Sequence, residues 1–151
     1  LRDRKVAENI AIAVGYHRNC TLPEAVELVW PWIEALDLER FADAPAGRIG
    51  RAWTQRVALA RALSLGPEVL LLDNPTAGMD QTHSDWWRGF LVQLREGHPL
   101  LNRRPMTLIE TTDNPRVGIK PLPKRAHLEN RRLVVLPSST PAHPHRSHDA
   151  P

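Results

Sequence analysis

The sequence feature that most constrains the fold is a short apolar run that ends on an acid, within the segment VLLLDNPTAGMD (residues 69–80). Consecutive apolar residues without polar alternation are typical of a β-strand covered on both faces, as in parallel sheets. Residues 68–73 are therefore predicted to form such a strand. Pro75 and Gly78 predict a turn after it, and Asp80 is a favourable N-cap for the next helix. The chain thus contains a strand, a turn and a helix, with an acid at the C-terminal end of the strand.

The residues before this unit predict a mainly helical region. A helical pattern begins in residues 6–14 and gives way to a polar break. The segment TLPE (residues 21–24) is a capping box, and it opens a helix with apolar residues at helical spacing as far as Leu36. Pro31 should kink this helix or split it in two. Residues 52–65 are rich in Ala, Leu and Arg and are closed by Gly-Pro, so they predict the clearest helix of the chain.

The residues after the unit continue an alternation of helix and strand. Residues 81–96 predict a helix, and residues 106–111 and 132–136 predict two more strands. This alternation favours an α/β layer after the helical region. The last residues are mostly small residues and helix breakers, which predicts disorder. The sequence therefore divides into a helical subdomain, an α/β part and a disordered tail, at residues 1–66, 67–136 and 137–151.

Composition narrows the class of protein. The net charge of +3 arises from 20 Lys and Arg against 17 Asp and Glu, which is mild for a nucleic-acid binder. No apolar run reaches the roughly 18 residues that a membrane span needs, so a membrane role would require a partner. The single cysteine, Cys20, rules out an intramolecular disulfide framework.

The acid at the end of the predicted strand is the first candidate for chemistry. Open α/β sheets bind ligands in the crevice at the C-terminal ends of their strands. Asp73 is therefore a candidate for holding a magnesium ion beside a phosphate group. Alternatively, Asp73 only caps the turn at Pro75. Spacing alone favours neither interpretation.

A family resemblance adds weight to the first interpretation. The segment QRVALARALSLGPEVLLLDNPTAGMD (residues 55–80) resembles the stretch of ABC-type ATPases from the signature helix through the Walker B strand to the D-loop. Upstream, KVAENIAIAVGY resembles the segment after the family's Q-loop; downstream, MTLIETTDNP resembles the switch region and AHLENRRLVVL the terminal strand pair. The resemblance covers residues 5–136. It implies part of a P-loop NTPase-like α/β domain, a helical subdomain followed by a strand-helix-strand core.

The resemblance also implies roles for particular residues. Asp73 matches the aspartate that assists Mg²⁺, and Asp80 matches the D-loop aspartate that reaches across a dimer of two such domains. Asn74 stands where the family usually has a glutamate that polarises the attacking water, and Thr112 stands at the switch histidine. The LSGGQ signature falls on residues 49–53 and is nearly erased. Asn74 and Thr112 are thus the candidate catalytic residues, and Asp73 is the candidate metal ligand.

These departures from the family pattern have physical consequences. Asn74 can orient a water but cannot accept its proton, and Thr112 can donate a hydrogen bond but cannot carry positive charge. The candidate nucleotide contacts are Gly50 and Arg51, in the signature region, and Asp80, in the D-loop. The Arg51 side chain would crowd a phosphate there or would offer it a charged fork.

The sequence contains no GxxxxGK[ST], the loop that cradles phosphates in this family. In the family's order that loop and the Q-loop precede the position that matches Leu1. Without the family's first strands, the apolar residues Trp30, Trp32, Val69 and Ile109 are expected to be less well buried than in a complete domain.

The resemblance implies part of an ATP-binding subunit of an ABC transporter, with ATP and Mg²⁺ as ligands and a degenerate catalytic site. Its expected partners are a transmembrane permease and a second ATP-binding subunit, without nucleic acid, at the cytoplasmic face of the membrane. This chain alone is expected to be inactive as an ATPase. The alternatives are a non-catalytic module that binds and regulates a partner, and a decayed, truncated product.

Overall fold

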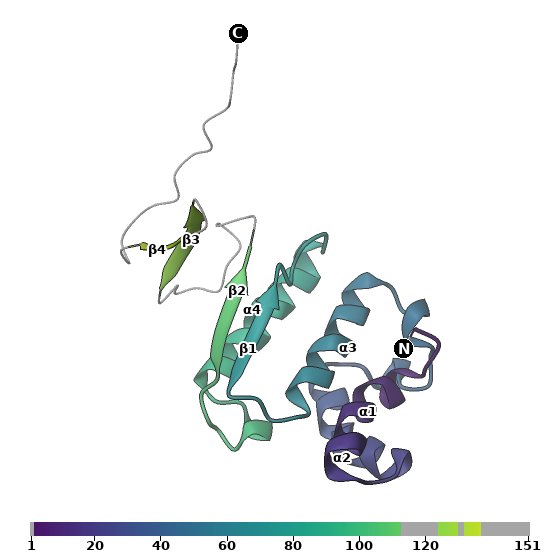
Figure 1. The fold of residues 1–151 in the computed structure, drawn as a ribbon. Helices are drawn as coiled ribbons and strands as arrows, with labels where there is room; N and C mark the ends of the chain where they lie inside the picture. Colours follow the sequence, from purple (N-terminus) through teal and green to yellow (C-terminus); the bar gives the residue numbers. More distant parts are fainter. Residues whose placement is uncertain (1, 113–123, 130–131, 137–151) are drawn as a thin grey trace.

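The computed structural model describes residues 2–112, 124–129 and 132–136. The predicted disordered tail, residues 137–151, lies outside the described residues. Figure 1 shows a helical region, a parallel strand pair with a helix alongside, and a separate hairpin. The elements in chain order are α1 (Val6–Arg18), α2 (Leu22–Ala35), η1 (Glu39–Phe41), η2 (Ala46–Arg48), α3 (Arg51–Leu63), β1 (Val69–Asp73), α4 (Gln81–Glu96), η3 (Pro99–Leu101), β2 (Thr107–Thr111), β3 (Arg125–Glu129) and β4 (Arg132–Leu136).

The helical region begins with the antiparallel pair α1 and α2. The predicted capping box forms, because the Glu24 carboxylate accepts hydrogen bonds from the Thr21 backbone N–H at 2.8 Å and hydroxyl at 2.7 Å. α2 runs through Pro31 as one helix, so Pro31 does not split it, and a kink there stays a prediction. α1 is longer than predicted and continues into the polar residues as far as Arg18, where Asn19 takes the left-handed conformation that ends it.

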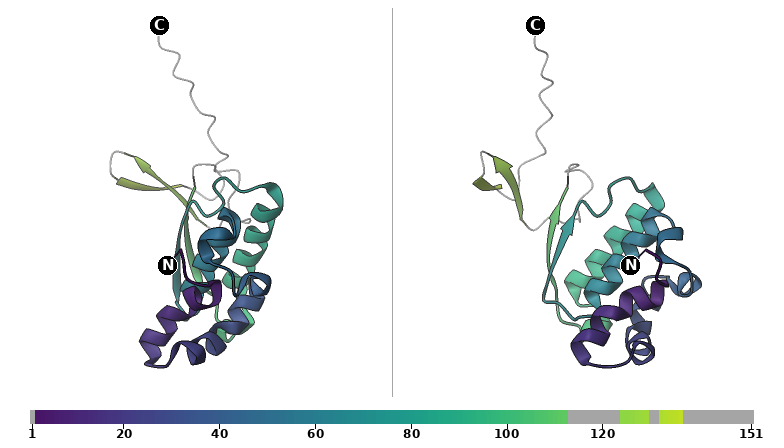
Figure 2. Two further views of the ribbon diagram at one scale, coloured as in Figure 1. Left: turned by 90° about the vertical axis from the view of Figure 1, so that its right-hand side faces the viewer. Right: turned by 45° about the vertical axis from the view of Figure 1, so that its right-hand side comes forward.

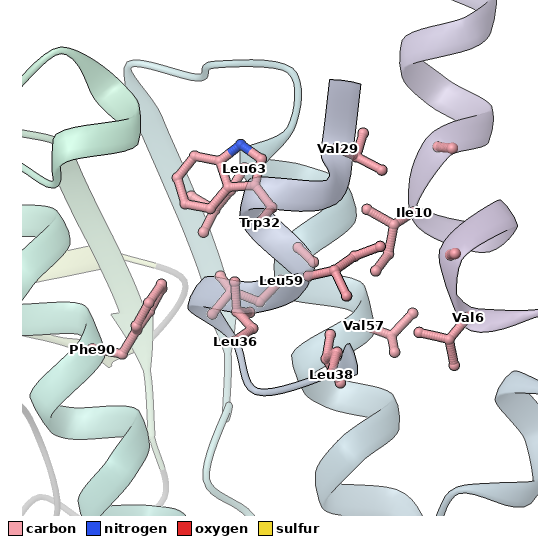
Figure 3. Close-up of a cluster of buried hydrophobic side chains, with 14 of the residues drawn as sticks. Val6, Ile10, Val29, Trp32, Leu36, Leu38, Val57, Leu59, Leu63 and Phe90 are labelled. Carbon is pink, nitrogen blue, oxygen red and sulfur yellow. The ribbon is translucent and has the colours of Figure 1, made fainter. Parts of the chain in front are cut away.

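The helical core forms where α3 packs against α1 and α2 (Figure 3). One face of α3 is apolar, and its residues Val57, Ala60 and Leu63 are at most 3% exposed. Small side chains such as Ala60 let helices approach closely, and the larger neighbours Ile10 and Ile33 fill the remaining space. Burial of this apolar surface is the main stabilising contribution in the helical region.

The strand pair supplies the α/β part. β1 and β2 are parallel, and Asp73 is paired with Thr111 at their C-terminal ends. α4 runs alongside the pair, as Figures 1 and 2 show, and the Met106 N–H donates to the Leu94 carbonyl at 3.1 Å. One aromatic and aliphatic face of α4 is buried, at Trp87, Phe90, Leu91 and Leu94. β3 and β4 pair antiparallel, as the resemblance implied.

The sheet is covered on one face only, which corrects the prediction of a strand buried on both sides. Leu70 and Leu72 are buried, whereas Val69 and Leu71 are 49% and 72% exposed. Of the residues expected to be poorly buried, Trp30, Val69 and Ile109 are 38%, 49% and 54% exposed. Trp32 is only 7% exposed, and its ring stacks on that of His98. Within the described residues, no helix is both long enough and apolar enough to cross a bilayer.

Candidate functional site

The C-terminal ends of β1 and β2 bring three of the predicted site residues to one edge of the sheet. The Thr111 hydroxyl donates a hydrogen bond of 2.6 Å to Asp73 Oδ1. The Asn74 backbone N–H donates to the Thr111 carbonyl at 3.0 Å and to its Oγ1 at 3.2 Å. Thr112, which is exposed, follows directly after β2. The strand ends therefore orient the exposed Asp73 carboxylate and set Asn74 and Thr112 at the same edge.

Thr111 was not among the residues predicted from the sequence. Its hydroxyl fixes one oxygen of Asp73, so it is part of the site. The signal was available, because the last residues of two adjacent parallel strands meet at one edge of a sheet.

Residues 74–80, here called the 74–80 turn, connect β1 to α4. Asn74 has a φ of 45°, in the left-handed region that Asn tolerates better than most residues. The turn is closed by hydrogen bonds from the Ala77 N–H to the Asn74 carbonyl at 3.1 Å and from the Met79 N–H to the Thr76 carbonyl at 3.2 Å. The backbone of Asn74 is thus fixed both to β2 and within its own turn.

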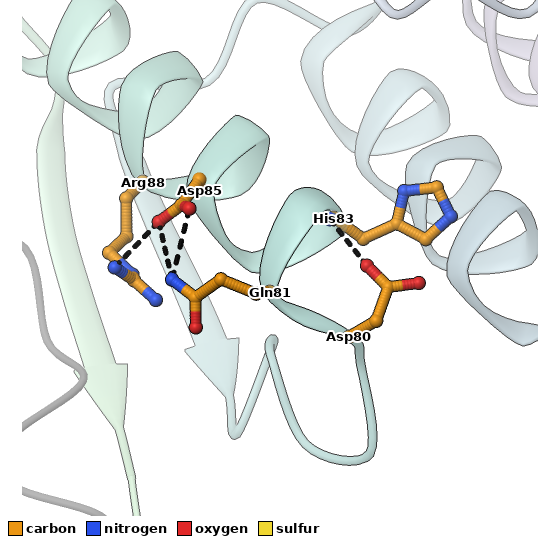
Figure 4. Close-up of polar contacts among 5 residues, drawn as sticks. All are labelled: Asp80, Gln81, His83, Asp85 and Arg88. Carbon is orange, nitrogen blue, oxygen red and sulfur yellow. Dashed lines mark hydrogen bonds and ion pairs between the residues drawn. The ribbon is translucent and has the colours of Figure 1, made fainter.

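Asp80 ends this turn and caps α4. Its Oδ1 accepts a hydrogen bond of 2.8 Å from the His83 backbone N–H, which is the predicted N-cap (Figure 4). The Asp85 carboxylate accepts hydrogen bonds of 2.9 Å from the Gln81 amide and the Arg88 guanidinium, on a separate part of the helix surface. The Asp80 side chain itself is exposed, so the cap leaves its carboxylate open to solvent.

Gly50 and Arg51 lie at the start of α3 and form a second cluster. Gly50 has a φ of 78°, a conformation that favours glycine, and Arg51 is the first residue of the helix. The Arg51 guanidinium lies against the 74–80 turn, since a Cβ on Gly78 would be 3.7 Å from Arg51 Nη1. This second cluster therefore contacts the turn rather than the strand ends.

A groove of about 540 Å³ runs along α3 from Gly50 to Arg61. Three arginines line it, Arg2, Arg51 and Arg61, and none of its lining residues is acidic. The groove is therefore positively charged, and the uncapped first turn of α3 opens towards it. Arg2 and Arg61 were not predicted as site residues, although Arg51, Thr54, Ala58 and Arg61 share one face of the helix by their spacing.

The donor atoms at the strand ends fit Mg²⁺ only together with a phosphate ligand. Among the described residues, no group of three His, Cys, Asp or Glu side chains could hold a metal. Mg²⁺ in phosphate sites commonly uses one or two carboxylates, substrate oxygens and waters. A single carboxylate such as Asp73, fixed at one oxygen by Thr111, suits that role.

An acid at the end of a parallel strand, followed by a tight turn and a capped helix, places the chain in the α/β class, with the P-loop NTPase fold of the similar solved structures. The model of the family described as ABC transporter matches residues 1–77, and the chain belongs to this family.

Individual relatives agree with this assignment. The Nod factor export ATP-binding protein I of Burkholderia thailandensis is 40% identical over 100 residues, which cover 66% of this chain and 33% of that protein. The high-affinity branched-chain amino acid transport ATP-binding protein BraF of Pseudomonas aeruginosa is 32% identical over 75 residues, which cover 50% of this chain and 29% of that protein. The chain thus spans about a third of the length of these curated relatives.

Solved structures show the same fold at lower identity. An ABC transporter in an inward-facing conformation matches with a TM-score of 0.73 and 18% identity, over 90% of this chain and 53% of that one. A bacterial ABC transporter cassette solved as a dimer matches with a TM-score of 0.64 and 22% identity, over 78% of this chain and 49% of that one. ABC ATPase domains are therefore the structural neighbours of this chain.

Proposed function

We propose that the chain forms part of an ATP-binding subunit of an ABC transporter and couples ATP binding and hydrolysis to transport through a transmembrane permease. The observation that carries this proposal is the Thr111–Asp73 hydrogen bond at adjacent parallel strand ends, with Asn74 and Thr112 beside it. This subunit would sit at the cytoplasmic face of the membrane, held there by the permease.

In this function Asp73 binds Mg²⁺, directly or through water, beside the phosphates of ATP. The ion supplies neutralisation of the negative charge on the phosphoryl group. Asn74 orients the attacking water through its side-chain oxygen, and Thr112 donates a hydrogen bond to the terminal phosphate. Neither residue replaces the proton acceptor or the positive charge that the family's glutamate and histidine supply. The site is therefore slow or degenerate.

The second cluster faces a nucleotide held mainly by a second ATP-binding subunit. Gly50 and the first turn of α3 provide backbone N–H groups, and Arg51 provides a charged fork for a phosphate. The positive groove supports this role for Arg51. Asp80 reaches across the same interface. Because the sequence has no GxxxxGK[ST], the cradle for the phosphates bound at Asp73 must come from residues outside this chain.

The role of Asn74 is tested in a chimera that joins the phosphate-loop half of the Burkholderia thailandensis relative to the start of this chain. We expect Asn74→Glu to raise steady-state ATP turnover by about 10² or more, because it restores a general base. Asn74→Gln is the matched control, since it has the same length as Glu but cannot accept the proton. Equal turnover in all three chimeras would show that Asn74 does not limit the chemistry. A chimera that fails to bind ATP with any residue at 74 would contradict the proposed function.

A second candidate function is a non-catalytic module that binds and regulates a partner subunit. The exposed apolar face of the strand pair, with Leu71 and Ile109 at 72% and 54% exposure, favours it. This function predicts that the chain binds a complete ATP-binding subunit equally well with and without ATP. An affinity that depends on ATP would favour the transporter function instead.

A further inference from the structure

A buried arginine lies outside the site described above and joins three helices. The Arg56 side chain on α3 is 4% exposed. Its guanidinium lies 4.4 Å from the centroid of the Trp53 ring and 3.5 Å from that of Trp86. It also donates hydrogen bonds to the Leu36 carbonyl at 3.1 Å and to Asp37 Oδ2 at 2.8 Å, at the end of α2. Arg56 therefore connects α2, α3 and α4 through one planar group.

Aromatic contacts continue from Arg56 and return to α2. On α4, Trp86 stacks on Phe90 with centroids 5.0 Å apart and an interplanar angle of 8°. Phe90 contacts His98 at 5.4 Å, and His98 stacks on Trp32 of α2 at 5.3 Å. Because Trp32 lies in the last turn of α2 and Leu36 is its C-cap, these contacts close a ring through α2, α3 and α4, here called the Arg56 ring.

The first half of α3 is also in contact with the 74–80 turn and the start of α4. The Arg51 guanidinium lies against Gly78, and the Trp53 ring meets the His83 ring edge-on at 5.2 Å. His83 is the residue whose backbone N–H binds the Asp80 carboxylate. Arg51, Trp53 and Arg56 thus contact Gly78, His83 and Trp86 respectively. These three partners follow one another along the chain, from the 74–80 turn into α4.

We propose that Arg56 is a positioning residue that holds the start of α3 and the 74–80 turn at a fixed spacing. The guanidinium suits this role, because its Cζ lies over the Trp53 and Trp86 rings while its Nη1 donates to the Leu36 carbonyl and to Asp37. A lysine keeps the charge but loses the planar group that makes these contacts together. This positioning concerns two parts of the chain and does not require bound nucleotide, so it stands apart from the proposed function.

The test is residue-resolved amide hydrogen exchange on the 151-residue chain with Arg56→Lys. We expect the amides of Thr54, Ala77, Met79 and His83 to exchange at least about tenfold faster. In this variant the Arg56 ring is already broken, so the local opening of this region costs less free energy. Amides inside α1 and α2, such as Asn9 and Ala25, should change by less than about twofold. A purely structural role predicts the same acceleration throughout the chain, and that result would overturn the proposal.

Arg61→Lys is the matched control. Arg61 is on the same helix and also donates to a buried side chain, at 3.1 Å to Asn9 Oδ1, but it faces α1. It should leave exchange in the 74–80 turn unchanged within about twofold.

Trp86→Leu is the second variant, and it keeps the test possible if Arg56→Lys does not fold. Trp86 is only partly buried, so its replacement is tolerable. It should reproduce the regional pattern of Arg56→Lys, and adding Arg56→Lys to it should accelerate exchange in the turn by less than about threefold more. Unchanged exchange at Ala77, Met79 and His83 in Trp86→Leu would overturn the proposal.

Discussion

Asn74 illustrates how local backbone preference and chemistry conflict at a single residue. Its φ of 45° suits Asn, whereas most other residues pay about 1–2 kcal/mol for the left-handed conformation. The family's glutamate would provide a general base at this position, but it would occupy a conformation that Asn tolerates better. Asn74→Glu is therefore expected to gain turnover while losing some stability. In the proposed function, Asn74 thus favours backbone stability over turnover.

His98 provides a prediction at the same scale. It is 8% exposed, and burial lowers its pKa from the usual 6.5 because desolvation disfavours the charged form. Its Nδ1 accepts the Leu100 N–H at 3.2 Å, which also requires a neutral ring. The unfolded chain therefore binds more protons than the folded chain below about pH 6.5, so stability rises with pH in that window and falls on acidification.

We expect the urea midpoint to fall between about pH 7 and pH 5, and the slope to flatten in His98→Gln. Equilibrium unfolding at several pH values measures this. An equal slope in His98→Gln would show that other groups cause the pH dependence.

At the scale of elements, periodicity and capping residues carry most of the information. The helix at residues 81–96 is predicted with its observed bounds, because Asp80 and Gly97 mark its ends. The predicted end of α1 is too early, because the polar residues Tyr16, His17 and Arg18 lie on an exposed surface and can continue a helix. The burial of β1 could not be read from VLLLD, because a continuous apolar run does not reveal which residues cover each face.

The site could be predicted only in part for the same reason. Asp73, Asn74 and Asp80 follow from one continuous segment, since a strand, a turn and a cap have local signals. Thr111 becomes a neighbour of Asp73 only through the register of β1 with β2, and Arg51 meets the 74–80 turn only through the packing of α3. Arg56 gives little local signal, because its hydrogen-bond partners lie 19 and 20 residues before it and Trp86 lies on another helix.

Gly89, inside α4, and Gly97, its C-cap, allow two matched predictions about the stability of this helix. Gly97 has a φ of 112°, and a Cβ there would lie 2.4 Å from the Arg103 carbonyl oxygen. Gly97→Ala should therefore destabilise the chain by more than about 1 kcal/mol. Gly89 lies inside α4 with open space around its Cα, so Gly89→Ala should stabilise by about 0.5–1 kcal/mol. Urea unfolding of both variants measures these changes, and a neutral Gly97→Ala would contradict the close approach of residue 103.

At the scale of the whole molecule, the strand pair separates two environments. Its inner face packs on α4 and the helical core through Leu70 and Leu72. Its outer face exposes Val69, Leu71 and Ile109 to solvent. Parallel sheets normally have both faces covered, because each face is apolar. The outer face is therefore the region where the chain is least adapted to water.

Adjacent leucines on opposite faces allow a direct test of this asymmetry. Leu71→Lys should change the free energy of unfolding by no more than about 0.5 kcal/mol and should reduce the binding of an apolar fluorescent dye. Leu70→Lys places a charge in the buried face and should destabilise by about 3 kcal/mol or more. Dye fluorescence and urea unfolding of both variants measure the contrast. If Leu71→Lys destabilised the chain as much as Leu70→Lys does, the outer face would be covered in solution, because only a buried leucine loses that much when it is replaced by a charge.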